Sequence, residues 1–474
     1  MRTGRAWMWS AITLTGWGLS ALACDGDVAE QEGTAEIRVV HAAAGAPAVD
    51  VYLAGDEAPL VAGLAYGEAS GFADLDAGEL EFEIRPAGAE ATSDPIYSTG
   101  PLAIHAGSRV DAIAAGRLDS TAGDDGFRVL TLVEQPSEPS DGALVRIVHA
   151  GADAPAVAID VGNDGSAEIQ DLARFSDTGD QAIELPAESE LRVGILAGLP
   201  LAPVTSFTLP PLPAGGEALI VASGLLSADP ADAEGFALFA FTPTASARIA
   251  QDPIVYALHA GPDAPAVDLY TPDTQPLALG LSFGQLSAGF RVAPRSQVIN
   301  VWPAGIEHGA APAAAATTPA LVAGQRYLVI ASGFLAPGAG EQAFGLVAAA
   351  VEFDREDSGA RVRLVHASPD APAVDVGTVH GDALGALLAT DLSYGKATPG
   401  KGVSVTQTPV DLGVAATGSA SIAARFNGVT IEPGARLFAV AAGALSPAVG
   451  RQSFRLIVVD AAAATWTATA IHPN

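Results

Sequence analysis

A pattern of residues that can do chemistry occurs four times along the chain. Each copy has a histidine, a proline six positions later and, in three copies, an aspartate nine positions later. If the histidine ends one strand and the aspartate lies in the next, the imidazole and the carboxylate can meet across the intervening turn. The histidines are His41, His149, His259 and His366, the prolines are Pro47, Pro155, Pro265 and Pro372, and the aspartates are Asp50, Asp268 and Asp375.

Two interpretations of this pattern compete. As a structural element, the histidine hydrogen-bonds the backbone of the following turn and satisfies buried polar groups, and we favour this interpretation. As a metal site, neutral histidine and ionised aspartate are suitable ligands, but two ligands are too few for a specific site, and we expect no bound metal. The second copy has Ala158 in place of the aspartate. Asp160, two residues further on the same strand face, is a partial substitute.

A hydroxyl group and a second aspartate also recur. Together with histidine and aspartate, the hydroxyl suggests the triad of an exported hydrolase. Serine and threonine alternate at this position, as suits a strand surface, and none lies in a Gly-x-Ser-x-Gly turn, so a hydrolase is the alternative and we expect no catalytic residue. The hydroxyls are Ser70, Thr178, Ser287 and Thr398, and the second aspartates are Asp153, Asp263 and Asp370, with Gly45 in the first copy.

Acidic turns suggest one more kind of site. Residues 124–126 (DDG) and 160–165 (DVGNDG) offer oxygen ligands of the kind that calcium prefers. Neither has the full spacing of an EF-hand loop, so we expect solvated turns and keep a calcium-binding protein as an alternative. The sequence has no Walker loop, no HExxH motif and no dinucleotide-binding glycine motif, and we expect no cofactor.

These residues belong to a unit of roughly 108 residues that is repeated four times. The run VRLVHASPDAPAVDV at 362–376 has close counterparts at 37–51, 145–159 and 255–269, which places the histidines 108, 110 and 107 residues apart. Three later landmarks keep the same register. They are an aromatic residue (Tyr66, Phe175, Phe283, Tyr394), a glycine that closes an apolar run (Gly116, Gly224, Gly333, Gly443) and a phenylalanine that opens the last run (Phe127, Phe236, Phe344, Phe454).

Each unit has the texture of β-strands. Residues 79–84 (ELEFEI) alternate strictly, as in a half-buried strand, and residues 327–331 (YLVIA) form an apolar run typical of a buried central strand. A unit of this length suits one sandwich rather than a propeller blade or a solenoid repeat. We therefore expect an all-β protein of four tandem antiparallel β-sandwich domains, immunoglobulin-like or transthyretin-like, with seven or eight strands each.

Short polar segments separate the expected domains. The sandwiches span residues 35–133, 143–242, 253–353 and 360–460, and a C-terminal tail follows over 461–474. The joins are residues 134–142, 243–252 and 354–359. Joins of this length keep neighbours close, so we expect a semi-flexible string of four independently folding sandwiches.

The run VHASPDAPAVDV at 365–376 resembles the signature of a bacterial family of exported domains, described as domain of unknown function 4397. The resemblance covers all four repeats, roughly residues 35–460. It implies export, tandem copies and a β-sandwich, and it implies no established activity. The first two copies depart from the signature at Gly45 and Ala158.

The N-terminus has the features of an export signal. Two arginines precede a mostly apolar, uncharged stretch that is too short for a membrane span. It ends in Ala-Leu-Ala before Cys24, which fits signal-peptidase cleavage and resembles a bacterial lipobox. We expect residues 1–23 to be removed, Cys24 to be lipidated and residues 24–34 to form an acidic tether. A soluble secreted protein with a free thiol is the alternative.

The composition narrows the functional class. The chain of 474 residues has 23 basic and 54 acidic side chains, a formal charge of −31, and no basic cluster, which argues against nucleic acid as a partner. One cysteine excludes an internal disulfide framework. We expect a non-enzymatic envelope or cell-surface lipoprotein that is held to the membrane by its lipid. Its four modules suit multivalent binding of a glycan or protein, through the motif loops, or a role as a spacer.

Overall fold

The computed structural model describes residues 33–120, 124–134, 141–179, 182–243, 245–306, 311–353, 358–406, 408–419, 421–463 and 465–474. Every regular element in these ranges is a β-strand. No helix in the described ranges is long and apolar enough to cross a membrane. The expected export signal, Cys24 and nearly all of the acidic tether lie outside the described residues.

The first repeat is a sandwich of two four-stranded sheets, with strand orders β4-β1-β7-β8 and β3-β2-β5-β6. The motif histidine ends the strand that begins the first sheet, and the motif loop crosses to the second sheet. The strands are β1 (Thr34–His41), β2 (Val49–Leu53), β3 (Val61–Leu64), β4 (Ala73–Asp76), β5 (Gly78–Pro86), β6 (Tyr97–Ile104), β7 (Arg109–Ala115) and β8 (Arg128–Glu134).

The second repeat has the same plan with one strand more. Its sheets have the orders β12-β9-β15-β16-β17 and β11-β10-β13-β14. The strands are β9 (Ala143–His149), β10 (Val157–Val161), β11 (Ile169–Leu172), β12 (Ile183–Leu185), β13 (Leu191–Ala197), β14 (Ala202–Leu209), β15 (Glu217–Ser223), β16 (Ala237–Phe241) and β17 (Ser246–Ala250).

The third repeat returns to two four-stranded sheets, β21-β18-β24-β25 and β20-β19-β22-β23. The strands are β18 (Ile254–His259), β19 (Val267–Tyr270), β20 (Pro276–Leu281), β21 (Phe290–Arg291), β22 (Val298–Pro303), β23 (Ala314–Thr317), β24 (Arg326–Ser332) and β25 (Gly345–Ala350).

The fourth repeat again has five strands in its first sheet, β29-β26-β32-β33-β34, beside β28-β27-β30-β31. The strands are β26 (Ala360–Ala367), β27 (Val374–His380), β28 (Ala383–Leu392), β29 (Val403–Val405), β30 (Val410–Ala416), β31 (Ile422–Val429), β32 (Arg436–Ala442), β33 (Arg455–Asp460) and β34 (Thr467–Ile471).

The predicted all-β fold of four repeated sandwiches is confirmed, with one addition to its antiparallel character. In each repeat the strand that carries the motif histidine at or next to its end pairs in parallel with the strand before the closing glycine. The chain visits the second sheet between these two strands, and it returns in the same direction. The other pairings between named strands are antiparallel.

Two segments expected to lie outside the sandwiches are strands within them. β17 lies in the expected join at 243–252 and pairs along its length with β16. β34 lies in the expected tail at 461–474 and pairs in the same way with β33. The expectation was wrong here because each segment has only five strand residues, and they alternate weakly between small and polar types.

The strands that carry the motif histidine have buried apolar residues on both faces next to the histidine. In β1, Ile37 and Val39 point into the core of the first sandwich. Val40 points the other way, is fully buried, and packs with Ile113 against Val148 of the second repeat. Because side chains alternate along a strand, this outer face has to be covered by a second body.

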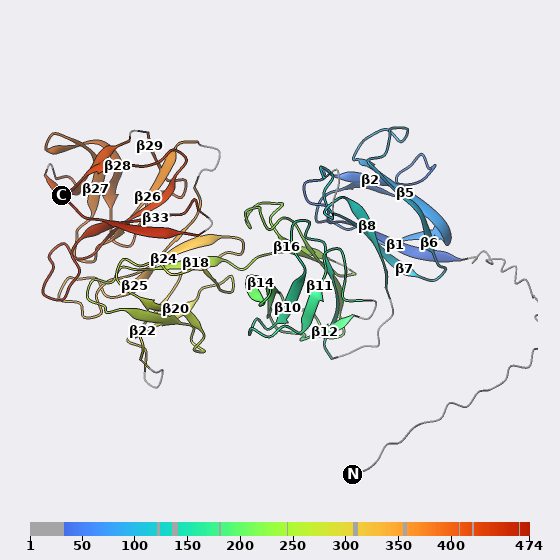
Figure 1. Cartoon of the computed structure of the whole chain (residues 1–474), viewed down its shortest axis with the longest axis horizontal. Coiled ribbons are helices and arrows are strands. Elements are labelled where there is room, and N and C mark those ends of the chain that lie inside the picture. Colours follow the sequence, from blue (N-terminus) through green and yellow to red (C-terminus); the bar gives the residue numbers. More distant parts are fainter. Residues whose placement is uncertain are drawn as a thin grey trace, which may run out of the picture.

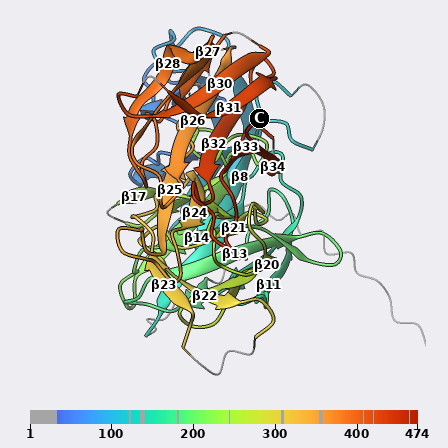
Figure 2. The same ribbon diagram turned by 90° about the vertical axis from the view of Figure 1, so that its left-hand side faces the viewer.

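The covering body is the neighbouring repeat, so the four sandwiches form two pairs. Repeats 1 and 2 share one buried apolar cluster, and repeats 3 and 4 share another, which includes Leu258 and Ile330 against Val365 and Val440. Figures 1 and 2 show the third repeat beneath the fourth, with their first sheets facing each other. The expected string of four separate sandwiches is therefore wrong, because the face that each would present to solvent is an apolar interface.

The two pairs meet through polar contacts. Arg326 of repeat 3 forms an ion pair of 2.7 Å with Asp229 of repeat 2. Arg295 forms a second ion pair with Glu190. The backbone N–H of Gly324 donates to the carbonyl of Gln251 at 2.7 Å. The junction between pairs is thus more hydrophilic than the interface within each pair.

Candidate functional site

The motif histidine has the same hydrogen bonds in all four repeats. Its Nε2 lies 3.0, 2.8, 2.9 and 2.9 Å from the carbonyl of the motif proline in repeats 1 to 4. Its Nδ1 accepts from the backbone N–H two residues later, at 3.2–3.4 Å. A carbonyl can only accept, so Nε2 carries the proton and the ring is the neutral tautomer. The hydrogen bond expected between the ring and the following loop is present in every repeat.

Burial makes these histidines poor acids and bases. The ring is almost fully buried in each repeat, and this desolvation lowers the pKa of His41, His149, His259 and His366. A buried neutral imidazole whose two nitrogens are both occupied has no free atom for a metal ion or a substrate. The arrangement holds a loop in place.

The motif aspartates do not meet the histidines, contrary to one sequence expectation. Each carboxylate instead accepts one backbone N–H from a residue with positive φ in the neighbouring edge strand and one from a turn of its own sheet, so it ties that strand to the turn. In repeat 1, Asp50 accepts from Gly63 at 2.6 Å and from Gly88 at 2.8 Å. Asp268 and Asp375 accept from the corresponding strand and turn residues of repeats 3 and 4.

In repeat 2 the carboxylate comes from a different position and binds a turn close to it in the sequence. Ala158 has no carboxylate, and Asp160 accepts from the backbone of Asp164 and Gly165 at 3.0 and 2.7 Å. The carboxylate of Asp160 thus binds the backbone of segment 160–165, the segment considered above as a calcium loop. Among the described residues, no three His, Cys, Asp or Glu side chains group as metal ligands.

The second aspartates and the hydroxyls also bind backbone. Asp153 accepts from the backbone N–H groups of Leu226 and Ser227. Asp263 in repeat 3 and Asp370 in repeat 4 accept from the corresponding pairs of backbone N–H groups. Ser70 accepts from the N–H of Val39 at 2.9 Å. Thr178, Ser287 and Thr398 accept from the matching residue of their repeats. Each recurring polar side chain thus binds the backbone of its own repeat, and within the described ranges no hydrogen bond joins one of these hydroxyls to a motif histidine.

The start of each motif loop is buried, and in repeats 1 and 4 it contacts the partner repeat, while the turn at the motif proline stays partly exposed. Residues 42–44 at the start of the first loop are buried. The Ser223 hydroxyl of repeat 2 donates to the carbonyl of Ala42 at 2.6 Å. In the other pair, the Ser332 hydroxyl of repeat 3 donates to Ala367 of repeat 4 at 2.7 Å. The most recognisable segment of each repeat is therefore part of a domain interface.

The aromatic landmark residue of each repeat contacts the partner repeat, and its type differs between the two members of a pair. Tyr66 of repeat 1 places its hydroxyl 3.3 Å from Ser223 of repeat 2. Tyr394 of repeat 4 bonds to Ser332 of repeat 3 in the same way. In the opposite direction, Arg128 stacks on Phe175 at 4.1 Å and Arg455 on Phe283 at 5.0 Å. Outer repeats 1 and 4 thus supply tyrosine and arginine, and inner repeats 2 and 3 supply phenylalanine and serine.

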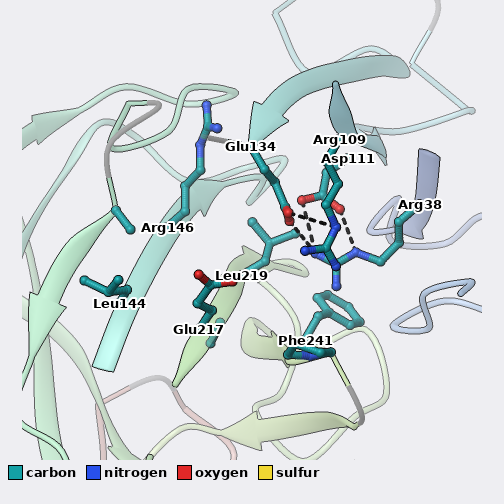
Figure 3. Close-up of a pocket in the computed structure, with 12 residues that line it drawn as sticks. Arg38, Arg109, Asp111, Glu134, Leu144, Arg146, Glu217, Leu219 and Phe241 are labelled. Carbon is teal, nitrogen blue, oxygen red and sulfur yellow. Dashed lines mark hydrogen bonds and ion pairs between the residues drawn. The ribbon is translucent and has the colours of Figure 1, made fainter. Parts of the chain in front are cut away.

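A charged cleft lies between repeats 1 and 2 (Figure 3). Arg38 is buried and bonds Asp111 through two nitrogens, at 2.6 and 3.1 Å, and Glu134 at 3.3 Å. Arg109 approaches the same glutamate at 3.3 Å. Repeat 2 supplies Leu144, Arg146, Glu217, Leu219, Phe241 and Pro243. The space they enclose is about 70 Å³, room for roughly five waters.

Glu134 has an unusual protonation equilibrium. Desolvation raises its pKa, and the neighbouring Asp111 raises it further, to about 7. Arg38 and Arg109 oppose the shift without cancelling it. The carboxyl therefore titrates near neutral pH, inside the interface between two repeats.

The sequence pattern did not single out this cleft. Arg38, Arg109, Asp111 and Glu134 come from β1, β7 and β8, and as a set they occur in the first repeat alone. A search for what the repeats share passes over them. A comparison of each aligned position would have found Asp111 and Glu134, which stand where repeat 3 has Leu328 and Val351.

The fold and the sites define a class of tandem β-sandwich proteins that are paired through their motif loops. The chain belongs to the family described as "Domain of unknown function (DUF4397)", whose matches cover residues 35–160 and 253–377. Each match begins in the first member of a pair and ends just beyond the motif of the second. The family resemblance drawn from the sequence is confirmed.

No curated protein matches the chain. Among solved structures, the Bacillus anthracis TIE protein aligns with 94% of this chain and 66% of its own, at 9% identity and a TM-score of 0.14. The chain thus spans less than two thirds of that protein, and similarity this low supports no conclusion about function.

Proposed function

We propose that the chain is a non-enzymatic, lipid-anchored envelope protein whose two repeat pairs act as a spacer that carries binding surfaces away from the membrane. The observation that supports this most is the use of the motif histidines. In four of four repeats both ring nitrogens are occupied by the backbone of the same loop. A site kept for catalysis would leave at least one of them facing a cavity with a nucleophile or a metal ligand.

Pairing supports the spacer role. A rigid two-sandwich body is held by a buried apolar interface and not by a flexible linker, so distance along the protein is preserved. The large negative charge keeps such a body soluble and separate from its neighbours. Export, lipidation at Cys24 and attachment to the membrane belong to this proposal.

Intact-mass measurement of protein from its native membrane fraction tests the anchor. We expect a chain that starts at Cys24 and carries acyl groups. A mature chain with a free Cys24 thiol would remove the anchor and leave a secreted spacer.

A panel of ester, peptide and glycoside substrates tests the absence of catalysis, with the His41→Gln, His149→Gln, His259→Gln, His366→Gln quadruple variant as control. We expect no turnover from either protein. Turnover by the native chain that the quadruple variant loses, while both remain folded by circular dichroism, would favour the hydrolase instead.

A further inference from the structure

One location at the interface differs completely between the two pairs. In pair 3–4 it is filled by Trp466, whose ring stacks on Tyr256 with 4.1 Å between centroids and 8° between planes. Phe438 lies on another side at 5.9 Å. Tyr256 stands three residues before the motif histidine of repeat 3. In repeat 1 that position is Arg38, which lines the charged cleft.

The walls of the two locations correspond position by position. Counted from the closing glycines and the phenylalanines that follow them, the apolar cluster around Trp466 aligns with the lining of the cleft. Leu328, Val351, Phe438 and Ala461 of pair 3–4 correspond to Asp111, Glu134, Leu219 and Pro243 of pair 1–2. The first two of these positions are charged in pair 1–2, and the last two remain apolar.

The cleft stays open because the hairpin that would close it is shorter. In repeat 4 six residues separate the ends of β33 and β34 in the sequence, and the last of them is Trp466. In repeat 2 four residues separate β16 and β17, and none of them is aromatic. The corresponding location in pair 1–2 is a cleft of about 70 Å³ that opens to solvent and is lined by Leu219 and Phe241 on one side, so it takes only part of an aromatic ring.

Arg109 is the most loosely bonded arginine of the polar wall. Its buried Nε lies 3.3 Å from a carboxylate oxygen of Glu134 and 3.4 Å from one of Glu36, as ion pairs, and among the described residues it has no partner with hydrogen-bond geometry. Its guanidinium is held over the Phe72 ring at 3.9 Å. Arg38 is satisfied by Asp111, and Arg146 by Asp177 and the carbonyl of Val133. An acceptor brought by a ligand would therefore bind Arg109 in preference to the other two arginines.

We propose that the cleft between repeats 1 and 2 is a binding site for a small aromatic carboxylate. The ring lies between Arg38 and the wall of Leu219 and Phe241, as the Trp466 indole lies against Tyr256. The carboxylate accepts from Arg109 and competes with Glu134 for it. Guanidinium groups favour both contacts, since they stack on aromatic rings and bind carboxylates. The site goes beyond the spacer role and does not depend on it.

Two sources share this chemistry, a free aromatic acid and the C-terminal aromatic residue of a peptide. Calorimetric titration of the whole mature chain with indole-3-carboxylate and with the peptide Ala-Ala-Trp separates them. Indole, cyclohexanecarboxylate and the peptide amide serve as ligand controls. We expect the acids with an aromatic ring to bind, and the three controls to bind at least about tenfold more weakly.

Two variants locate the site. Arg109→Gln should weaken binding about tenfold or more, and Leu219→Trp should abolish it by filling the cleft from the apolar wall. The matched control is Arg326→Gln, because Arg326 has the same position in repeat 3 and should leave binding unchanged. Thermal melts of each variant establish that it is folded.

The proposal fails if no aromatic acid binds the native chain at millimolar concentration. It fails equally if Arg109→Gln and Leu219→Trp, both folded, leave affinity unchanged, because the ligand then binds elsewhere. Binding of the amide as tightly as the free peptide would exclude the carboxylate contact. Each of these results leaves the tests of the spacer role unaffected.

Discussion

The interfaces of pair 1–2 and pair 3–4 are alike at their rim, which is formed by the tyrosine–serine and arginine–phenylalanine contacts. They differ at their centre, the location that Trp466 occupies in pair 3–4. At the rim, tyrosine meets serine and arginine covers phenylalanine in both. At the centre, pair 1–2 has the ion cluster of Arg38, Asp111 and Glu134, and pair 3–4 has an aromatic stack. The two interfaces thus keep the same rim contacts and a matching set of buried apolar residues, while one location changes from charged to aromatic.

The rim is also more completely bonded in pair 3–4. The backbone N–H of Gln342 donates to Pro369, and that of Gln452 donates to Pro262, so each loop bonds the motif loop of its partner. Arg451 adds a two-point ion pair with Glu341. Both features and the apolar centre lead us to expect that pair 3–4 is the more stable of the two.

The largest effect should come from dividing a pair. Residues 358–474 alone would expose Val365, Phe438, Val440 and Ile457, all fully buried in the whole chain. We expect this fragment to self-associate or to be only partly folded, and residues 253–474 to be a folded monomer. Gel filtration with light scattering and circular dichroism measure both. A folded, monomeric 358–474 would restore the view that each repeat is an independent unit.

Loss of the aromatic plug comes next. Trp466→Ala removes a side chain that is 4% exposed, and truncation of a buried tryptophan costs about 3–5 kcal/mol. Calorimetry should show the transition of pair 3–4 moving down while that of pair 1–2 stays in place. Pro243→Ala is the control at the aligned turn of repeat 2, and it should change little. Equal movement of both transitions would mean that the two pairs unfold as one unit.

The motif histidines should have similar effects in both pairs. His366→Ala leaves the carbonyl of Pro372 and the N–H of Ser368 without partners in a buried loop, at a cost of about 1–3 kcal/mol. For a unit of about 220 residues, each kcal/mol lowers the melting temperature by about 2–4 °C. His41→Ala is the counterpart in pair 1–2. Unchanged melting together with loss of a measured binding activity would reverse the structural assignment.

The tyrosine–serine contact sharpens the pairing rule. Tyr66→Phe and Ser223→Ala each remove part of a hydrogen-bonded chain that ends on the carbonyl of Ala42. We expect each to cost about 0.5–1.5 kcal/mol, and the double variant to cost less than the sum. Denaturant unfolding of the four proteins measures the coupling. Strict additivity would show that the two hydroxyls do not act together.

The smallest effect is the pH dependence of stability. It has opposite signs for the buried histidines and for Glu134. The buried histidines have lowered pKa values, so their contribution to stability is complete above about 6.5 and is lost as the pH falls. Glu134 has a raised pKa of about 7, so its contribution is complete at low pH and is lost as the pH rises from its unfolded value of 4.5 through 7.

Glu134→Gln therefore tests pair 1–2 alone. The variant should be more stable than the native chain at pH 8 by about 1 kcal/mol, a value reduced for the partial solvent exposure of the side chain. The advantage should disappear at pH 5, and the transition of pair 3–4 should not move at either pH. A constant difference across this range would mean that Glu134 stays ionised in the folded protein.

The sequence predicted what each repeat does within itself. The period, the strands and the bond from each histidine to its own loop all follow from patterns shared by the four copies. The partners of Asp50 were beyond reach, because they are backbone N–H groups of Gly63 and Gly88, and an N–H group has no signature in the sequence. Val39 and Val40 are apolar on opposite faces of β1, but Glu36 and Arg38 share the face of Val40, so the sequence does not show that another repeat covers this face.

The cleft was hidden for the opposite reason. Arg38, Asp111 and Glu134 belong to one repeat, and a repeated sequence draws attention to what its copies share. Trp466 was assigned to a tail because the five residues before it are small and uniform. Its role depends on Tyr256, which lies in another repeat and has no equivalent tyrosine elsewhere in the chain.

The strands β17 and β34 control the direction of growth of the whole molecule. In repeat 1, Glu36, Arg109 and Glu134 are paired across the first sheet. Because β1 and β7 run in one direction and β8 in the other, the chain leaves this sheet at the end where it entered. The next repeat must then fold back beside it. In repeat 2 one more strand reverses the direction, and Ala250 lies level with Ala237 at the opposite end. An even number of reversals carries the chain onward and an odd number returns it, so insertion of a pair would lengthen the protein, whereas insertion of a single repeat would reverse its course.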